Sequence, residues 1–192
     1  LFSLRSDASW GIGEIGDLLA FASLVARAGV GLVQLLPIAE ISLGNTSPYA
    51  ALSAFGIDPM FLSLTHVADL QAQSNEQALG HDGAAKLATL RRAPGVDYEA
   101  VRPLKRRALV AGLKVFHERE LSAGTTHSRR ARSFIDFLAA HADWLPDYAI
   151  YRAIKDEHRG AAWWELPVPL RDRDPAALRA ELLATGATFR TR

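Results

Sequence analysis

The sequence predicts an α/β fold in which helices predominate. Within residues 1–64, helical and strand patterns alternate, as they do in a sheet covered by helices. From residue 65 onward nearly every periodic segment has helical spacing, whereas a continuing parallel sheet would keep alternating strands with helices. With 49% hydrophobic residues in 192, the chain can bury a sizeable core. We therefore expect a first part at 1–64 and a mainly helical inserted subdomain at 65–192.

Each element of the first part has its own signal. Asp17 is a suitable N-cap and Gly29 a suitable stop for a helix whose apolar residues recur at helical spacing. An apolar run closed by Pro37 favours a buried strand, most easily a central parallel one. Ser47-Pro48 begins a short helix and Asp58-Pro59 ends it. In chain order the predicted elements are a helix at 17–28, a strand at 32–36, a polar loop at 38–47, a helix at 47–55 and a strand at 60–64.

The second part reads as a series of helices. The predicted helices cover residues 84–92, 99–121, 128–141, 144–158 and 174–185. Gly160 ends the fourth of them, and a segment rich in Trp and Pro, 161–172, precedes the last one.

Composition and charge limit the kinds of partner and cofactor that the chain can be expected to bind. Lys and Arg number 22 against 21 Asp and Glu, so the net charge of +1 gives no electrostatic case for a nucleic-acid or membrane-surface partner. No apolar run is long enough to span a bilayer. The sequence has no cysteine, and its six histidines show no metal-ligand spacing, so we expect no metal, no cofactor and a cytoplasmic location. Because the chain starts at Leu1 and its single methionine is Met60, we expect it to be part of a longer protein.

The segment Gly11–Gly16 matches the pattern G-x-G-x-x-G, and Glu40 follows at a distance suited to a ribose-binding acid. A dinucleotide site, however, requires an apolar strand ending at Ser9 or Trp10 and a helix beginning at Gly13. Polar residues occupy the place of that strand. We therefore favour a turn that lets the backbone pack closely before a helix.

The loop that follows Pro37 is the strongest candidate for a site. It lies at the carboxyl end of the predicted strand, where α/β folds build their active sites. In it, Tyr49 has a flat face and a polar tip, so it can stack on a sugar ring and hydrogen-bond at its edge. The alternative is that Tyr49 fastens the loop to the core, and spacing does not distinguish the two.

Two further segments have competing interpretations. Trp163 and Trp164 are either a sugar platform or an apolar plug that docks a Pro-rich connector. The apolar stripe of the 99–121 helix is a candidate surface for a helical interaction domain, provided that it is not buried within the chain. That stripe consists of Leu104, Ala108, Ala111 and Val115.

Four ordered blocks cover nearly the whole chain. They are Leu4-Arg5-Ser6 with Trp10-Gly11-Ile12-Gly13-Glu14-Ile15-Gly16-Asp17, Val33-Gln34-Leu35-Leu36-Pro37-Ile38, Ser47-Pro48-Tyr49-Ala50-Ala51-Leu52-Ser53-Ala54-Phe55 with Asp58-Pro59-Met60-Phe61, and Trp163-Trp164-Glu165-Leu166-Pro167 with Pro169-Leu170-Arg171-Asp172-Arg173. With these blocks the sequence resembles the 4-alpha-glucanotransferases, or amylomaltases, of glycoside hydrolase family 77.

The resemblance implies a (β/α)8 TIM barrel with a large helical insertion, in which this chain supplies the N-terminal part and 33–37 the first barrel strand. It also implies retaining transfer of α-1,4-glucan segments between maltooligosaccharides, a reaction of starch and glycogen metabolism. That reaction needs two carboxyl groups about 5 to 5.5 Å apart. In the family these carboxylates lie on later strands, so no catalytic residue is expected in this chain, and the chain alone is expected to be inactive.

The resemblance carries over one binding motif. Tyr49 matches the aromatic that stacks on the donor glucose next to the cleaved bond, and Ser47 and Pro48 position it. The family often has Gly-Asp before this motif, where this chain has Gly44-Asn45-Thr46, so we expect Asn45 as a differing sugar ligand. Asp58 likewise stands where Asn is common. The alternative functions are a non-catalytic glucan-binding module and a helical interaction module.

Overall fold

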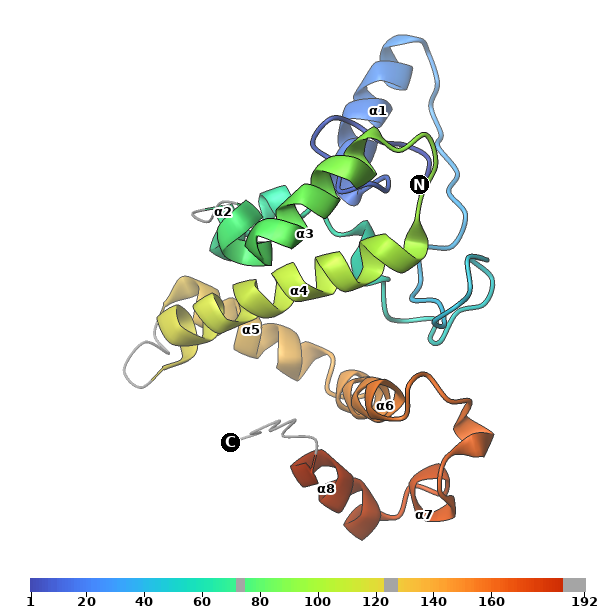
Figure 1. Ribbon diagram of the computed structural model, residues 1–192, viewed down its shortest axis with the longest axis vertical. Coiled ribbons are helices and arrows are strands. Elements are labelled where there is room, and N and C mark those ends of the chain that lie inside the picture. The colour runs from blue at the N-terminus through green and yellow to red at the C-terminus, as the bar shows by residue number, and fades with distance from the viewer. Residues whose placement is uncertain (72–74, 123–127, 185–192) are drawn as a thin grey trace. The chain divides into compact units, whose positions relative to one another are not determined.

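A computed structural model describes residues 1–71, 75–122 and 128–184. The chain forms two compact units, Leu1–Arg132 and Ser133–Arg192. Over the described residues the secondary structure is helical, with two isolated antiparallel bridges and no strand (Figure 1). The mostly helical character predicted for this chain is thus confirmed. The first unit contains residues 1–64 together with the first helices that follow residue 64. The division of the chain into a barrel start and an inserted subdomain stays a prediction.

The core of the first unit is built around one long helix. Helix α4 (Tyr98–Phe116) packs against α3 (Asn75–Arg92), α2 (Ala68–Gln71) and the 3-10 turns η1 (Pro59–Phe61) and η2 (Leu64–His66). Its buried face includes Val101 and Leu104, which meet Ile12 from the N-terminal turn in the same apolar cluster. The π-helical turn η3 (His117–Leu121) extends α4, and α5 (Arg129–Ala140) follows. Helix α4 therefore packs against both the N-terminal segment and the helices α2 and α3.

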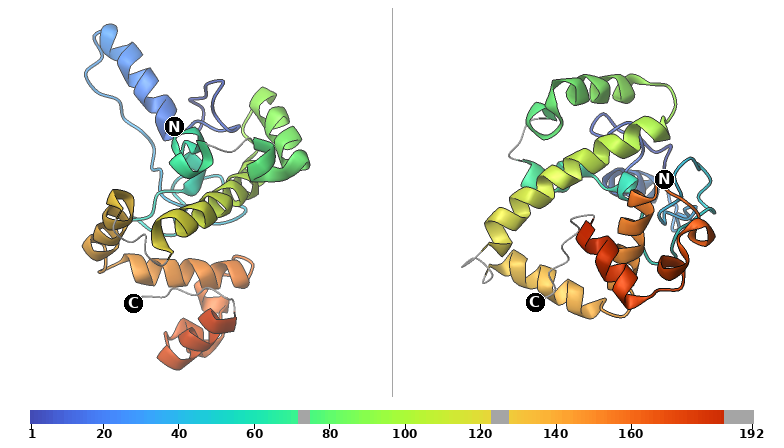
Figure 2. Two further views of the ribbon diagram at one scale, coloured as in Figure 1. Left: turned by 90° about the vertical axis from the view of Figure 1, so that its left-hand side faces the viewer. Right: turned by 60° about the horizontal axis from the view of Figure 1, so that its bottom comes forward.

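Helix α1 (Ile15–Arg27) begins two residues earlier than predicted. Glu14 is its N-cap, and the Asp17 carboxylate accepts the Glu14 backbone N–H at 2.7 Å from inside the first turn. Gly29, at φ +85°, follows the C-cap, as its predicted role as a stop requires. None of the residues of α1 is buried, and after it the chain turns back beside the helix (Figures 1 and 2).

Two elements predicted within residues 32–64 are wrong, and a third, the strand at 32–36, does not form in this structure. Segment 32–36 has no regular structure, because a strand needs a hydrogen-bonded neighbour and no described segment pairs with it. Residues 47–55 form turns and a bridge instead of a helix, because the Leu52 N–H bonds across to the Glu40 carbonyl. Residues 60–64 form parts of η1 and η2 instead of a strand, since Lys105 takes the Met60 and Leu62 carbonyls.

The helices predicted after residue 84 are confirmed, and apart from the start of the first one their ends lie within a few residues of the prediction. Helix α3 starts earlier than predicted and carries a break at Gly80, whose φ is +73°. Asp97 caps α4 through the Ala100 N–H at 2.9 Å. The predicted end of the last helix, Thr185, lies outside the described residues.

The second unit contains most of α5, then α6 (Leu145–Glu157), the 3-10 turn η4 (Trp163–Glu165), α7 (Val168–Arg171) and α8 (Pro175–Ala184). A small apolar cluster of Ile154, Leu166 and Leu170 holds α6, α7 and α8 together. Among the described residues, no helix has the length and apolar character that crossing a bilayer requires.

Candidate functional site

Residues 38–58 form a loop that closes on itself, here called the 38–58 loop. At its neck the Asp58 N–H bonds to the Ile38 carbonyl at 2.9 Å, and the Glu40 N–H bonds to the Gly56 carbonyl at 2.9 Å. Nearer the tip, Ile41 pairs with Ala51 in an antiparallel bridge. The neck therefore has the backbone pairing of a hairpin, although it is too short to count as a strand pair.

Side chains fold the tip of the 38–58 loop locally. The Asn45 side-chain oxygen accepts the Ser47 N–H at 3.3 Å, and the Ser47 hydroxyl accepts the Tyr49 N–H at 3.4 Å. Such turns are typical of Asn and Ser in loops. Asn45 and Ser47 are thus both exposed and both occupied with shaping the backbone that carries Tyr49.

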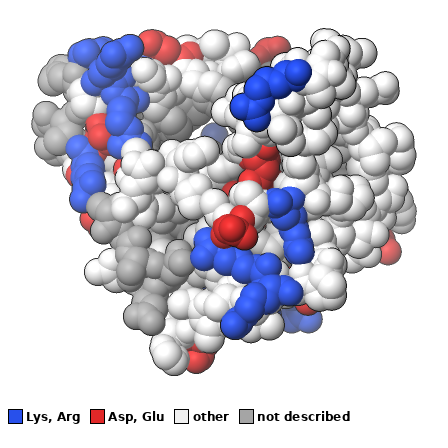
Figure 3. All heavy atoms as spheres, turned by 90° about the horizontal axis from the view of Figure 1, so that it is seen from above, with Lys and Arg blue, Asp and Glu red and all other residues white. Residues whose placement is uncertain are grey.

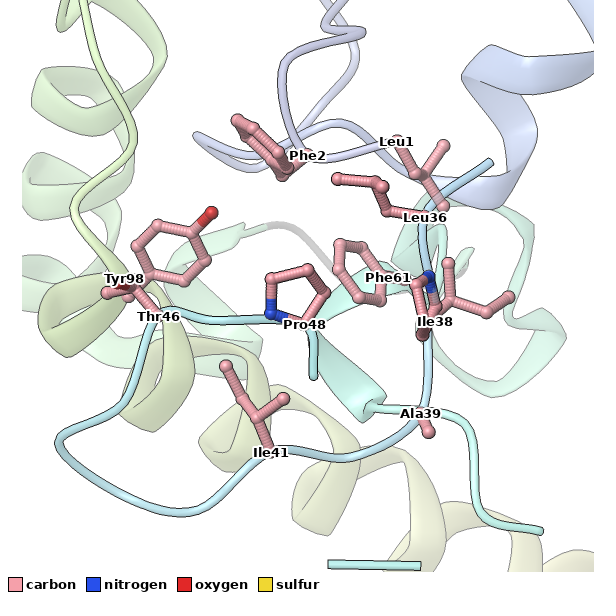
Figure 4. Close-up of a pocket in the computed structure, with 11 residues that line it drawn as sticks. Leu1, Phe2, Leu36, Ile38, Ala39, Ile41, Thr46, Pro48, Phe61 and Tyr98 are labelled. Atoms are coloured by element: carbon pink, nitrogen blue, oxygen red, sulfur yellow. The ribbon is translucent and has the colours of Figure 1, made fainter. Parts of the chain in front are cut away.

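Tyr49 and Pro48 lie in opposite environments. Tyr49 is 74% exposed, so the alternative in which its ring fastens the loop to the core is wrong. Pro48 fastens the loop instead, because together with Thr46 it lines a small apolar pocket under the loop (Figure 4). The other walls of the pocket come from the N-terminal segment, from residues 36–41, from Phe61 and from Tyr98 at the start of α4. The pocket, at about 20 Å³, has room for about one water molecule and is too small for a sugar ring.

A buried carboxylate stands where the neck of the loop meets α4. Asp58 is fully buried and accepts hydrogen bonds from the Met60 N–H at 2.9 Å and the Ile41 N–H at 3.3 Å. The guanidinium of Arg102 forms an ion pair with it at 3.2 Å. The sequence alone marks Asp58 as a helix-ending residue and as a departure from the family's Asn, and it gives no sign of the partner, which is 44 positions away.

A second ion pair lies one turn further along α4. The Lys105 ammonium contacts the Glu14 carboxylate at 2.6 Å, and both side chains are almost completely buried. The same ammonium donates to the carbonyls of Met60 at 2.6 Å and Leu62 at 2.8 Å. Burial raises the pKa of Glu14 and lowers the pKa of Lys105, and the charge of each partner opposes the shift of the other. Neither residue was singled out as functional from the sequence.

The glycine motif has a structural role. Gly11 has φ +81°, and a Cβ at Gly13 would collide with the backbone carbonyls of Leu1 and Leu4. The helix begins at Ile15 and not at Gly13, and residues 4–10 form no strand where a dinucleotide site would have one. The close-packing interpretation is confirmed, and the dinucleotide alternative is wrong.

The two remaining candidate surfaces differ in whether their side chains are exposed. In the second unit, Trp163 and Trp164 are 54% and 65% exposed and meet edge to face at 84°, so among the described residues they are not a buried plug. In α4, Leu104 and Ala108 are buried in the core of the first unit, while Ala111 and Val115 are half-buried. The helical interaction hypothesis therefore loses its surface.

The surface carries charged groups of both signs. On the face shown in Figure 3, acidic atoms lie beside groups of Lys and Arg, with uncharged surface between these groups. Within the part of the chain that the structure describes, no three histidine or acidic residues are placed to hold a metal ion.

Comparison with known proteins identifies the family. The family model described as 4-alpha-glucanotransferase, glycoside hydrolase family 77, matches residues 1–187. A 4-alpha-glucanotransferase of Synechocystis sp. is 31% identical over 175 residues, which are 88% of this chain and 31% of that protein. The corresponding proteins of Thermus thermophilus and Aquifex aeolicus are 31% and 32% identical and cover 88% and 90% of this chain.

The chain belongs to glycoside hydrolase family 77, the 4-alpha-glucanotransferases. It spans about a third of the length of these curated relatives, 31% in each of the three. The resemblance stated from the four sequence blocks is thereby confirmed.

Proposed function

We propose that this chain is part of a 4-alpha-glucanotransferase that transfers α-1,4-glucan segments between maltooligosaccharides. Membership of the family supports the activity and the class of substrate. The reaction is a retaining double displacement: a carboxylate forms a covalent glycosyl intermediate, and an acceptor sugar releases it. Transfer prevails over hydrolysis where the acceptor sugar is held in place for the second step.

The exposed ring of Tyr49 is the observation that carries the role of this chain. An aromatic side chain with 74% of its surface in water gains little from the fold it belongs to, so its ring is available to a ligand. The aromatic face suits the apolar C–H face of a glucose ring, and the hydroxyl can bond at the edge of the sugar. Ser47 and Pro48 hold the backbone beside the binding position, and Asn45 shapes the turn before it.

Three aspartates of this chain that could be considered as catalytic residues form ion pairs or hydrogen bonds within the fold. Asp58 pairs with Arg102, and Asp69 receives both terminal nitrogens of Arg130 at 3.0 and 2.6 Å. Asp174 caps α8 through the Ala177 N–H. These contacts agree with the expectation from the family resemblance that the catalytic carboxylates lie on later strands, so we assign no catalytic carboxylate to this chain and expect the chain alone to be inactive.

The apolar surface around α1 supports residues 1–64 as the start of a TIM barrel. Leu19 and Leu24 of α1 and Leu32 and Leu36 after it are exposed, Leu32 by 82%. An amphipathic helix followed by an apolar segment without a hydrogen-bonded neighbour is what the first units of a barrel present before the other strands are added. In this proposal 33–37 pairs as the first barrel strand, and 65–192 is the inserted helical subdomain.

The experiment uses the complete protein with maltotriose as both donor and acceptor, and measures the glucose and the longer oligosaccharides formed. Replacing Tyr49 with Ala removes the stacking face and should lower kcat/KM by about tenfold, which corresponds to about 1.4 kcal/mol. Tyr49→Phe keeps the face and should retain most of the activity. The matched control is Leu43→Ala, which removes another exposed apolar side chain from the same loop. Equal losses in Tyr49→Ala and Leu43→Ala would contradict the stacking role.

A non-catalytic glucan-binding module is the second candidate, and the exposure of Trp163 and Trp164 favours it. Their planes are nearly perpendicular, so they offer a sugar one face at a time. In that case the complete protein would change its tryptophan fluorescence with maltoheptaose but form no new oligosaccharides. The proposal further includes a place in starch or glycogen metabolism and a cytoplasmic location, since this sequence has no cysteine to pair in an oxidising compartment.

A further inference from the structure

The position of Tyr49 depends on where the 38–58 loop leaves the core. The loop has two anchors, the Pro48 pocket near its tip and Asp58 at its neck. The tip itself is shaped by hydrogen bonds within the loop, at 3.1 to 3.4 Å, which the N–H groups of Ser42, Asn45, Ser47, Tyr49 and Ala50 donate. These bonds shape the tip but do not connect it to the core, so its orientation depends on the Pro48 pocket and on the neck.

One carboxylate joins both sides of the neck. Oδ2 of Asp58 accepts the Ile41 N–H from the outgoing side, and Oδ1 accepts the Met60 N–H from the returning side. A carboxylate with no exposed surface is costly unless it is paired, and Arg102 lies 3.2 Å from Oδ2 and 3.4 Å from Oδ1. The positive charge that balances the buried Asp58 carboxylate therefore comes from Arg102 of α4.

Helix α4 is a rigid support for this charge. Its residues Val101 and Leu104, on either side of Arg102, are buried in the core. One turn later, Lys105 holds the carbonyls of Met60 and Leu62, directly after Asp58. The helix thus holds the returning end of the loop at two successive points.

From this arrangement we infer that Arg102 is a positioning residue for sugar binding, acting through Asp58 to set the orientation of the loop that presents Tyr49 to the donor glucan. This inference rests on the proposed function. Arg102 does not touch the sugar: its side chain is 16% exposed and is directed at the neck, not at the tip.

The test is a double-mutant cycle in the complete enzyme, with kcat/KM for maltooligosaccharide transfer as the readout. Arg102→Met should lower kcat/KM by about tenfold in the parent background and by less than about twofold in a Tyr49→Ala background, because the loop acts through that ring. A residue that only stabilises the fold would cause equal losses in both backgrounds, and that result would overturn the inference.

Arg130→Met is the matched control. It breaks another Arg–Asp pair of the first unit, with Asp69, away from the 38–58 loop. Thermal midpoints should fall in both arginine variants, but kcat/KM should stay within about twofold of the parent in Arg130→Met. A comparable loss of kcat/KM in the control would also overturn the inference.

Asp58→Asn provides a second route if Arg102→Met does not fold. The amide keeps an acceptor for one N–H of the neck and needs no cation, so it should show the same coupling to Tyr49, and Asp58→Asn/Arg102→Met should regain part of the stability lost in Arg102→Met. Additive effects of Asp58→Asn and Tyr49→Ala would count against the inference.

Hydrogen exchange separates this inference from the proposed function. Arg102→Met should speed amide exchange across residues 38–58, and Arg130→Met should not. If the complete protein forms no transfer products, the proposed function fails while the exchange result still tests the neck. If transfer occurs but exchange in the loop is unchanged in Arg102→Met, the inference alone fails.

Discussion

The buried pair of Lys105 and Glu14 leads to an asymmetric prediction. If Lys105 is replaced by Met, the Glu14 carboxylate remains almost completely buried, with the Trp10 N–H donating to it at 2.8 Å but without the ammonium that balances its charge. Removing one partner of a buried pair costs about 3 to 5 kcal/mol. If Glu14 is replaced by Gln, Lys105 keeps the carbonyls of Met60 and Leu62, so the loss should be about 1 to 3 kcal/mol.

The pH dependence of the two variants should have opposite signs. Burial raises the pKa of Glu14, and in Lys105→Met the opposing positive charge is gone. The folded state then takes up a proton that the unfolded state releases, so the deficit of Lys105→Met should narrow from pH 8 to pH 5. Burial lowers the pKa of Lys105, so in Glu14→Gln the folded state releases a proton that the unfolded state keeps, and this variant should gain stability as the pH rises.

The assay is urea unfolding of the complete protein at pH 5 and pH 8, followed by tryptophan fluorescence, to which the buried Trp10 beside the pair contributes. The double variant Glu14→Gln/Lys105→Met completes the cycle and should cost less than the sum of the single changes. A loss below about 1 kcal/mol in Lys105→Met, or the same pH trend in both single variants, would refute the argument that the pair is held together by burial.

Two further predictions concern the turn before α1 and the start of α5. Gly13→Ala should lower the free energy of unfolding by about 1 to 3 kcal/mol or more, since its Cβ would collide with the Leu4 carbonyl, while Gly31→Ala, in open space, should change it by less than about 0.5 kcal/mol; denaturant titration measures both. Arg130 lowers the pKa of Asp69 by hydrogen bonding, so their pair stabilises the fold above the ordinary Asp pKa of 3.8 and loses this effect as the pH falls below it. The difference in thermal midpoint between the parent and Arg130→Met should therefore shrink from pH 5 to pH 3, and a difference independent of pH would contradict this.

The helices were predicted from residues close together in the sequence. The elements that were predicted wrongly depend on contacts between residues far apart in the sequence. Gly29 acts as a stop from its own backbone position, so the sequence was sufficient for this helix end. Segment 32–36 has the composition of a strand, but a strand exists only through a neighbour, and none is present among the described residues. The same apolar run would pair in the barrel proposed above.

The candidate site was predictable in part for the same reason. Tyr49 on a polar loop could be recognised because its residue type and its neighbours are local, and the structure shows the ring exposed. The pairing of Asp58 with Arg102 could not be predicted from the sequence, because 44 residues separate them. Taken alone, Asp58 is an acid that ends a helix, and Arg102 is an ordinary charged residue of a helix. Only the fold brings them together.

The two sides of the 38–58 loop differ in what supports them. The apolar surface after α1 is uncovered among the described residues, whereas the neck of the loop is tied to α4 by Asp58 and Lys105. The polar contacts that hold the neck therefore come from α4, while Leu36 of the preceding segment lines the Pro48 pocket. If Tyr49 binds the donor sugar as proposed, a change in α4 should therefore alter sugar binding without touching the ring that meets the sugar.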